Sequence, residues 1–229
     1  MRTCFSLLVV LLLAQGCAAQ ISQNGRQAAG QTPASNLLTV PDFIQQGWRY
    51  YPVKGHTAYK IISMDDRLAI QATGVGGAGG LIRTLPADAP ACRHLSWVWR
   101  LERLQPSADL TRKDGDDVAV SIFVLFGDPG FLSSPIKVPT LRYVWSTARH
   151  KTGDIIANPY MPKLVKNIVV RAGPRDSGQW LTESRDLAAD FRRAFGRDPE
   201  SPVRAVAIFT DNDQTGEPVT ANYEKLNCS

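Results

Sequence analysis

The sequence predicts a mainly β protein, an antiparallel β-sandwich with one short helix, and three observations lead to this fold class. Short runs rich in β-branched and aromatic residues recur along the chain, clusters of Gly, Pro and Asp separate them, and almost no helical pattern lies between them. Parallel strands need long crossovers, usually helices, whereas antiparallel strands can be joined by tight turns. We therefore expect one sandwich domain over residues 37–229.

The predicted strands follow one another between residues 59 and 226, each bounded by turn-forming residues. They are residues 59–63, 67–72, 80–84, 95–101, 118–126, 141–147, 167–171, 203–210 and 219–226. A single helix is expected over residues 185–195, because Leu187, Phe191 and Phe195 recur at helical spacing. Gly196 supplies the left-handed residue that ends such a helix. We expect this helix to close one end of the sandwich.

The N-terminal segment has the pattern of an export signal. Arg2 precedes an apolar run over residues 5–14, whose ten residues would span only about 15 Å as a helix, too short to cross a bilayer. Residues 14–17, Ala-Gln-Gly-Cys, resemble a bacterial lipobox. The expected segments are a signal peptide over 1–16, and a lipidated Cys17 with a flexible tether over 17–36. The expected location is the periplasmic face of the outer membrane, reached through the lipid anchor.

Two cysteines remain in the predicted domain, Cys92 and Cys228. In an oxidising compartment an isolated pair of this kind indicates a disulfide, which would join the C-terminal strand to the middle of the domain. The alternative is a pair of separate thiols.

Charge and motifs exclude several functions. The net charge is +5, but the basic residues are scattered without a polybasic run, so nucleic-acid binding is not expected. The sequence contains no G-x-S-x-G, H-E-x-x-H or Cys/His metal spacing. Residues 74–79 match a dinucleotide-binding glycine pattern, but a predicted strand follows instead of the required helix, so this interpretation is rejected.

Aromatic residues alternate on two predicted strands. Trp97 and Trp99 share one face of their strand with Arg100 on the other, and Tyr143 and Trp145 repeat the arrangement. Such rings either fill the core of the sandwich or form a platform on which sugar rings stack. These five residues are therefore candidate ligand-binding residues, together with four acidic ones: Asp116, Asp117, Asp211 and Asp213.

Two acidic clusters stand at strand ends. Asp116 and Asp117 precede one predicted strand, and Asp211 and Asp213 follow another. If these strands are antiparallel neighbours, the clusters meet at one end of the sandwich. Their repulsion then needs a cation, such as calcium held by Asp117, Asp211 and Asp213, or basic side chains, for which Arg100 and Arg142 are the candidates. We prefer arginine over calcium and expect no other cofactor.

Several of these stretches together resemble the domain-of-unknown-function 3047 family of bacterial envelope and secreted proteins. The similar stretches are WVWR at 97–100, GDDVAVSIFVLF at 115–126, LRYVW at 141–145, RDLAADFRRAFG at 185–196 and VAIFTDNDQTG at 206–216. The resemblance implies a jelly-roll-like sandwich and carries no established activity. The family usually ends in Tyr-Gly-Asp and an aliphatic residue, whereas residues 223–226 here read Tyr-Glu-Lys-Leu.

From these observations we expect a monomeric, lipid-anchored envelope protein that binds a ligand, a glycan above all, without catalysis. Two alternatives remain open. The domain could be a structural or assembly partner of another envelope component. It could instead be a hydrolase or lyase acting on polysaccharide, because two carboxylates suffice for glycoside hydrolysis and their separation is invisible in sequence.

Overall fold

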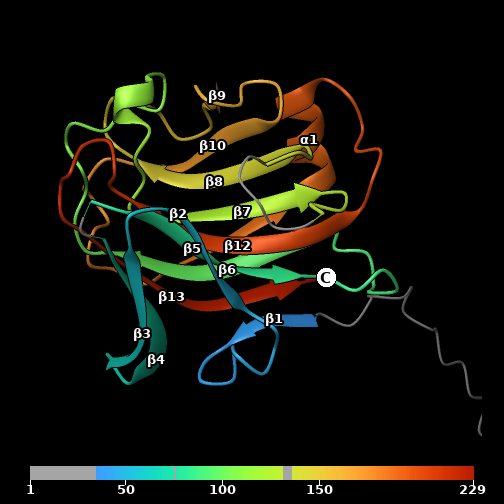
Figure 1. Cartoon of the computed structure of the whole chain (residues 1–229), viewed down its shortest axis with the longest axis horizontal. Coiled ribbons are helices and arrows are strands. Elements are labelled where there is room, and N and C mark those ends of the chain that lie inside the picture. Colours follow the sequence, from blue (N-terminus) through green and yellow to red (C-terminus); the bar gives the residue numbers. More distant parts are fainter. Residues whose placement is uncertain (1–34, 75, 131–135) are drawn as a thin grey trace, which may run out of the picture. The chain divides into compact units, whose positions relative to one another are not determined.

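The structure, a computed structural model, describes residues 35–74, 76–130 and 136–229. The strands of these residues form two β-sheets (Figure 1). The expected signal peptide and Cys17 lie outside these residues. The six-stranded sheet has the order β11-β6-β13-β4-β3, with β1 also pairing with β13. Its strands are β1 (Ser35–Thr39), β3 (Thr57–Met64), β4 (Arg67–Gly74), β6 (His94–Leu101), β11 (Leu181–Asp186) and β13 (Val219–Cys228).

The seven-stranded sheet has the order β2-β5-β12-β7-β8-β10-β9. Its strands are β2 (Arg49–Lys54), β5 (Ala78–Thr84), β7 (Ser121–Phe126), β8 (Thr140–Ser146), β9 (Ile155–Ala157), β10 (Val165–Ala172) and β12 (Val203–Asp211). A 3-10 turn, Lys113–Gly115, precedes β7. Each strand expected from the sequence is present, so the prediction of a β-sandwich is confirmed.

One strand pair departs from the antiparallel arrangement. β8 and β10 run parallel, whereas β9 pairs antiparallel with β10. The chain leaves β8, forms the short edge strand β9, and then returns through β10 between them. The loop after β9 therefore crosses the outer face of this sheet, and its residues Asn158, Tyr160 and Met161 become available to the site described below.

The core lies between the two sheets and is filled by the aromatic side chains that the sequence singled out. Trp97, Trp99, Tyr143 and Trp145 are all at most 2% exposed. The ring centroids of Trp97 and Tyr143 lie 5.1 Å apart across the sandwich, and those of Trp99 and Trp145 lie 6.2 Å apart. Because these rings stabilise the fold by burial, they are not available as a sugar platform, and the core-filling alternative is the correct one.

Helix α1 (Leu187–Phe195) begins two residues later than expected, because Arg185 and Asp186 complete β11. The Asp186 side chain accepts a hydrogen bond from the Ala189 amide as the N-cap, and Gly196 at φ 72° ends the helix. Phe191 packs against Phe126, with ring centroids 4.6 Å apart, so α1 covers the end of the core where β7 ends (Figure 1). Within the described residues, no helix is long and apolar enough to cross a bilayer.

The disulfide between Cys92 and Cys228 is confirmed, with Cα atoms 5.2 Å apart and a sequence separation of 136 residues. It joins the end of β13 to the segment that leads into β6. The neighbouring backbone supports the same connection, because the amides of Arg93 and His94 both donate to the Ser229 carbonyl.

Candidate ligand-binding cleft

The outer face of the seven-stranded sheet is unusually apolar. Register places Ile82, Ala207, Phe123 and Arg142 side by side in one row across β5, β12, β7 and β8. Ile82 and Ala207 belong to a small apolar cluster with Leu125 and Ala205, separate from the main core, against which Tyr51, Phe123 and Val138 pack. A sheet with apolar residues on both faces has something covering its second face or presents a binding surface there.

This outer face forms the floor of a cleft of about 590 Å³, a size suited to a small ligand. Its apolar part lies over β5, β12 and β7, and polar side chains gather at one end. Among the residues that line it are Tyr51, Ile82, Phe123, Leu125, Ala207 and Phe209 on the floor, and Lys54, Asp116, Arg142, Asn158, Tyr160, Asp211, Asp213 and Gln214 at the polar end.

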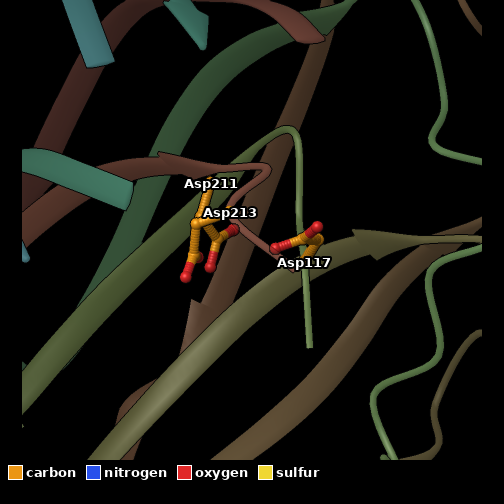
Figure 2. Close-up of side chains that lie close together, drawn as sticks. All are labelled: Asp117, Asp211 and Asp213. Carbon is orange, nitrogen blue, oxygen red and sulfur yellow. The ribbon is translucent and has the colours of Figure 1, made fainter. Parts of the chain in front are cut away.

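The two acidic clusters meet at this polar end, as the sequence predicts. β7 and β12 are antiparallel neighbours, so the residues that precede β7 lie beside those at the end of β12. One carboxylate oxygen from each of Asp117, Asp211 and Asp213 lies within 4.8 Å of the other two (Figure 2). The end of the sandwich that holds these carboxylates is opposite to the end that α1 covers.

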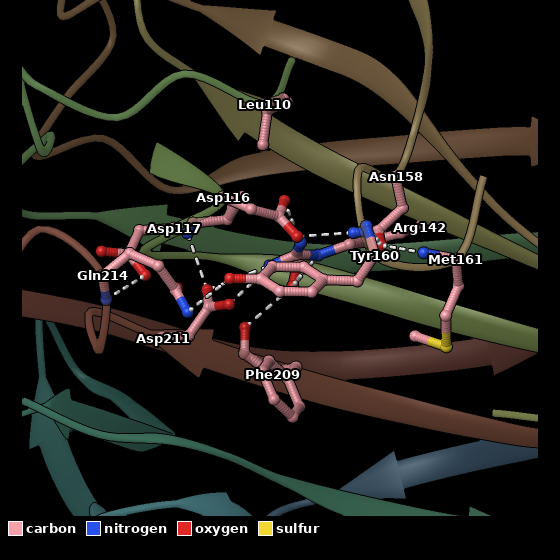
Figure 3. Close-up of polar contacts among 12 residues, drawn as sticks. Leu110, Asp116, Asp117, Arg142, Asn158, Tyr160, Met161, Phe209, Asp211 and Gln214 are labelled. Carbon is pink, nitrogen blue, oxygen red and sulfur yellow. Dashed lines mark hydrogen bonds and ion pairs between the residues drawn. The ribbon is translucent and has the colours of Figure 1, made fainter. Parts of the chain in front are cut away.

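Arg142 neutralises part of this cluster. Its Nη1 lies 3.2 Å from Asp116 Oδ1, and its Nη2 donates to both carboxylate oxygens of Asp211 at 3.0 and 3.1 Å (Figure 3). The Arg142 guanidinium also lies 5.2 Å from the centroid of the Phe123 ring. The Arg142 side chain is only 2% exposed, so this is a buried ion pair whose members depend on one another.

Burial raises the pKa of the carboxyl groups that Arg142 contacts. The pKa of Asp211 rises to about 8, because desolvation outweighs the attraction of Arg142 and because Asp116 and Asp117 repel its charge. The pKa of Asp116 is also raised, mainly by desolvation, with Arg142 and a hydrogen bond from Asn158 opposing the shift. Both carboxyl groups are therefore harder to ionise than exposed ones, even with the Arg142 guanidinium beside them.

The remaining carboxylates have other partners. Asp117 accepts hydrogen bonds from the amides of Gln214 and Thr215, at 3.2 and 2.6 Å. Asp213 pairs with Lys54 across the cleft, with Nζ 3.1 Å from Oδ2. Each of the three residues expected to hold calcium thus has protein donors, and Arg142, one of the two basic residues expected here, contacts Asp116 and Asp211.

Arg100 does not belong to this site, which corrects the sequence prediction. It lies on β6 in the other sheet and pairs with Asp65 and Glu102, at 2.5 and 2.7 Å. Its position in sequence resembled that of Arg142, because both residues flank aromatic strand residues. The order of strands in space, which places β6 and β8 in different sheets, separates them.

Sequence reasoning missed most of the cleft. Lys54, Asn158 and Tyr160 come from a strand end and a loop with no motif of their own. The apolar floor of the cleft, in contrast, had a recognisable pattern in the sequence. In the segment 118–126 apolar residues occupy both alternating sets, and only one set, with Ile122 and Val124, faces the core.

The departure at residues 223–226 leaves the cleft unchanged. Lys225 is exposed on β13 and contacts Glu224, with Nζ 3.5 Å from Oε1. Glu224 also pairs with Arg67 at 2.6 Å. Both residues lie in the six-stranded sheet, so the substitution of an acid by Lys225 does not remove a carboxylate from the acidic cluster.

Comparisons with known proteins place the chain in a family. A search of curated proteins finds no match. Among solved structures, the chain is similar to the glycoside hydrolase domain of Endo-D from Streptococcus pneumoniae R6, at 10% identity and a TM-score of 0.38. The alignment covers 80% of this chain and 21% of that one, and the likeness is too distant to indicate an activity. Residues 46–227, however, match the family described as protein of unknown function (DUF3047), and this match extends over both sheets. The chain belongs to the DUF3047 family.

Proposed function

We propose that this chain is an exported, lipid-anchored protein of the bacterial envelope that binds a glycan in the cleft of its seven-stranded sheet. The observation that carries the proposal is the composition of the cleft, where an apolar floor with aromatic rings meets a polar end rich in carboxylates and amides. Sugars have both kinds of surface, because their C–H faces pack on rings while their hydroxyl groups donate to carboxylates. The pattern of residues 1–17 supports the envelope location.

A glycan array tests the binding proposal directly. The purified chain is applied to an array of bacterial and plant glycans, and the best ligand is then titrated by calorimetry. Tyr160 is half exposed at the cleft, so Tyr160→Ala removes a ring without opening the core. We expect affinity for the best array ligand to fall by about 1 kcal/mol, roughly fivefold in Kd.

Ile61→Ala is the matched control, because Ile61 has similar exposure but lies on β3 of the other sheet. No binding to any glycan on the array, or equal losses in the two variants, would contradict the proposal.

Catalysis on a polysaccharide is the second candidate, and one observation favours it. Asp116 and Asp211 both line the cleft and both have a raised pKa, as a general acid requires. Both oxygens of Asp211 already accept hydrogen bonds from Arg142, which favours a structural role for this carboxyl group. Release of new reducing ends from a polysaccharide that the chain binds, lost in Asp116→Asn, would decide for catalysis.

A further inference from the structure

We propose that the cleft prefers glycans that carry a protonated amine, such as glucosamine polymers, over neutral and anionic glycans; this inference rests on the function proposed above. It follows from the balance of charge at the polar end. Asp116, Asp211 and Asp213 line the cleft and Asp117 lies beside them. Among the residues that the structure describes, only two basic side chains, Arg142 and Lys54, line the same cleft.

The carboxylates differ in how firmly their present partners hold them. Asp211 is fixed by the buried guanidinium of Arg142, and Asp117 by two backbone amides. Asp213 differs, because its partners are two side chains: the Gln214 amide, which donates to it at 2.7 Å, and the flexible side chain of Lys54, which is 63% exposed. Because most of the Lys54 side chain is exposed, it can move into solvent when a ligand amine takes its place beside Asp213.

Lys54 also indicates which chemical group suits this position. Its ammonium group lies 3.1 Å from the Asp213 carboxylate, and its Nζ is 3.4 Å from the Asp213 carbonyl. The Asp213 side chain is only 7% exposed, so its charge is poorly solvated and attracts a cation strongly. A sugar amine placed here would make the same contacts as the lysine that it displaces.

The neighbouring groups favour the same ligand. Desolvation raises the pKa of Asp116 and of Asp211, and a bound ammonium group nearby would favour the charged form of both carboxyl groups. A uronic acid would add a further negative charge to a cleft that already has an excess of carboxylates. The apolar floor beside Asp213, formed by Phe209 and Ala207, remains free to contact the C–H face of the sugar.

The test compares three oligosaccharide probes of equal length: oligomers of glucosamine, of N-acetylglucosamine and of glucuronic acid. The chain is titrated with each at about pH 6, where a large share of glucosamine amines is protonated while the carboxylates of the glucuronic acid probe are ionised. We expect the glucosamine oligomer to bind about tenfold more tightly than its N-acetylated counterpart, and the glucuronic acid oligomer to bind most weakly. The advantage of glucosamine should shrink as salt is added.

Two variants address the residues that carry the inference. Asp213→Asn should abolish the advantage of the glucosamine oligomer while leaving affinity for the N-acetylated oligomer unchanged. Lys54→Met removes the competing ammonium and should tighten glucosamine binding. Asp198→Asn is the control, because Asp198 is an exposed acid paired with Arg192, at the end of the sandwich opposite to the carboxylates.

The outcomes separate this inference from the proposed function. Equal binding of the glucosamine and N-acetylglucosamine oligomers, or an unchanged advantage in Asp213→Asn, would overturn the preference for amines and leave glycan binding standing. Failure of all three probes overturns the preference, whereas failure on the whole glycan array overturns the proposed function as well.

Discussion

Arg142→Met tests how far the acidic cluster depends on one buried cation. Methionine has a similar length and keeps an apolar stem near Phe123, but it removes the guanidinium donors to Asp116 and Asp211. Both carboxyl groups would then be buried without a cation, since their side chains are only 7% and 9% exposed. The variant thus isolates the charge of Arg142 from its packing.

The size of the effect follows from this burial. Breaking a buried pair by removing one member costs about 3–5 kcal/mol, because the other member is left uncompensated. That is a large share of the roughly 5–15 kcal/mol by which domains are stable. The loss should be greatest at alkaline pH. Without Arg142 the pKa of both carboxyl groups rises further, so acidification protonates them and returns stability.

Urea unfolding at several pH values, followed by tryptophan fluorescence, measures the effect. Arg171→Met is a close control: Arg171 also contacts two carboxylates, Glu183 and Asp176, but its side chain is 35% exposed. We expect that control to cost at most about 1 kcal/mol. A similar loss in both variants, or a loss in Arg142→Met that does not change with pH, would refute the reasoning.

Three further predictions concern other features of the chain. Reducing the Cys92–Cys228 disulfide should lower the free energy of unfolding by up to about 5 kcal/mol, the value that loop entropy gives for a separation of 136 residues, and unchanged urea unfolding under reductant would contradict this. The pKa of Asp211 is about 8 in the folded chain and near 4 when unfolded. As pH rises from about 4 to 8, ionisation of Asp211 should therefore lower the free energy of unfolding by up to about 1.4 kcal/mol per pH unit. Asp211→Asn should flatten that pH dependence. Cys17→Ser should move the protein from the membrane to the soluble fraction or block its processing; unchanged fractionation and mass would refute the anchor.

Much of the fold could be predicted because local patterns determine it. Turn residues and β-rich runs placed the strands, and Asp186 and Gly196 are signals that bound a helix in any context. The parallel pairing of β8 and β10 could not be predicted in this way. That pairing depends on the path of the chain through the edge strand β9 before it forms β10. No local sequence pattern in β9 or β10 encodes this path.

The candidate site, too, has features that local sequence patterns predict and features that only the folded structure reveals. Asp117 and Asp211 could be paired in advance, because antiparallel neighbours bring the start of one strand to the end of the other. Arg142 could be named as their partner for its charge alone. Lys54 and Tyr160 could not, because they reach the cleft from an edge strand and a loop, and their contribution depends on the curvature and packing of the whole sheet.

The position of β13 has a consequence for biogenesis. This strand starts at Val219, yet it pairs with β4, β6 and β1 in the middle of the six-stranded sheet. A chain emerging from the ribosome or a translocation pore therefore cannot complete that sheet until residue 228 has appeared. Until then the edges of β4 and β6 are unpaired and prone to aggregation. Chaperone binding should consequently persist until synthesis reaches β13, and a chain that stops at residue 218 should be degraded rather than accumulate in a partly folded form.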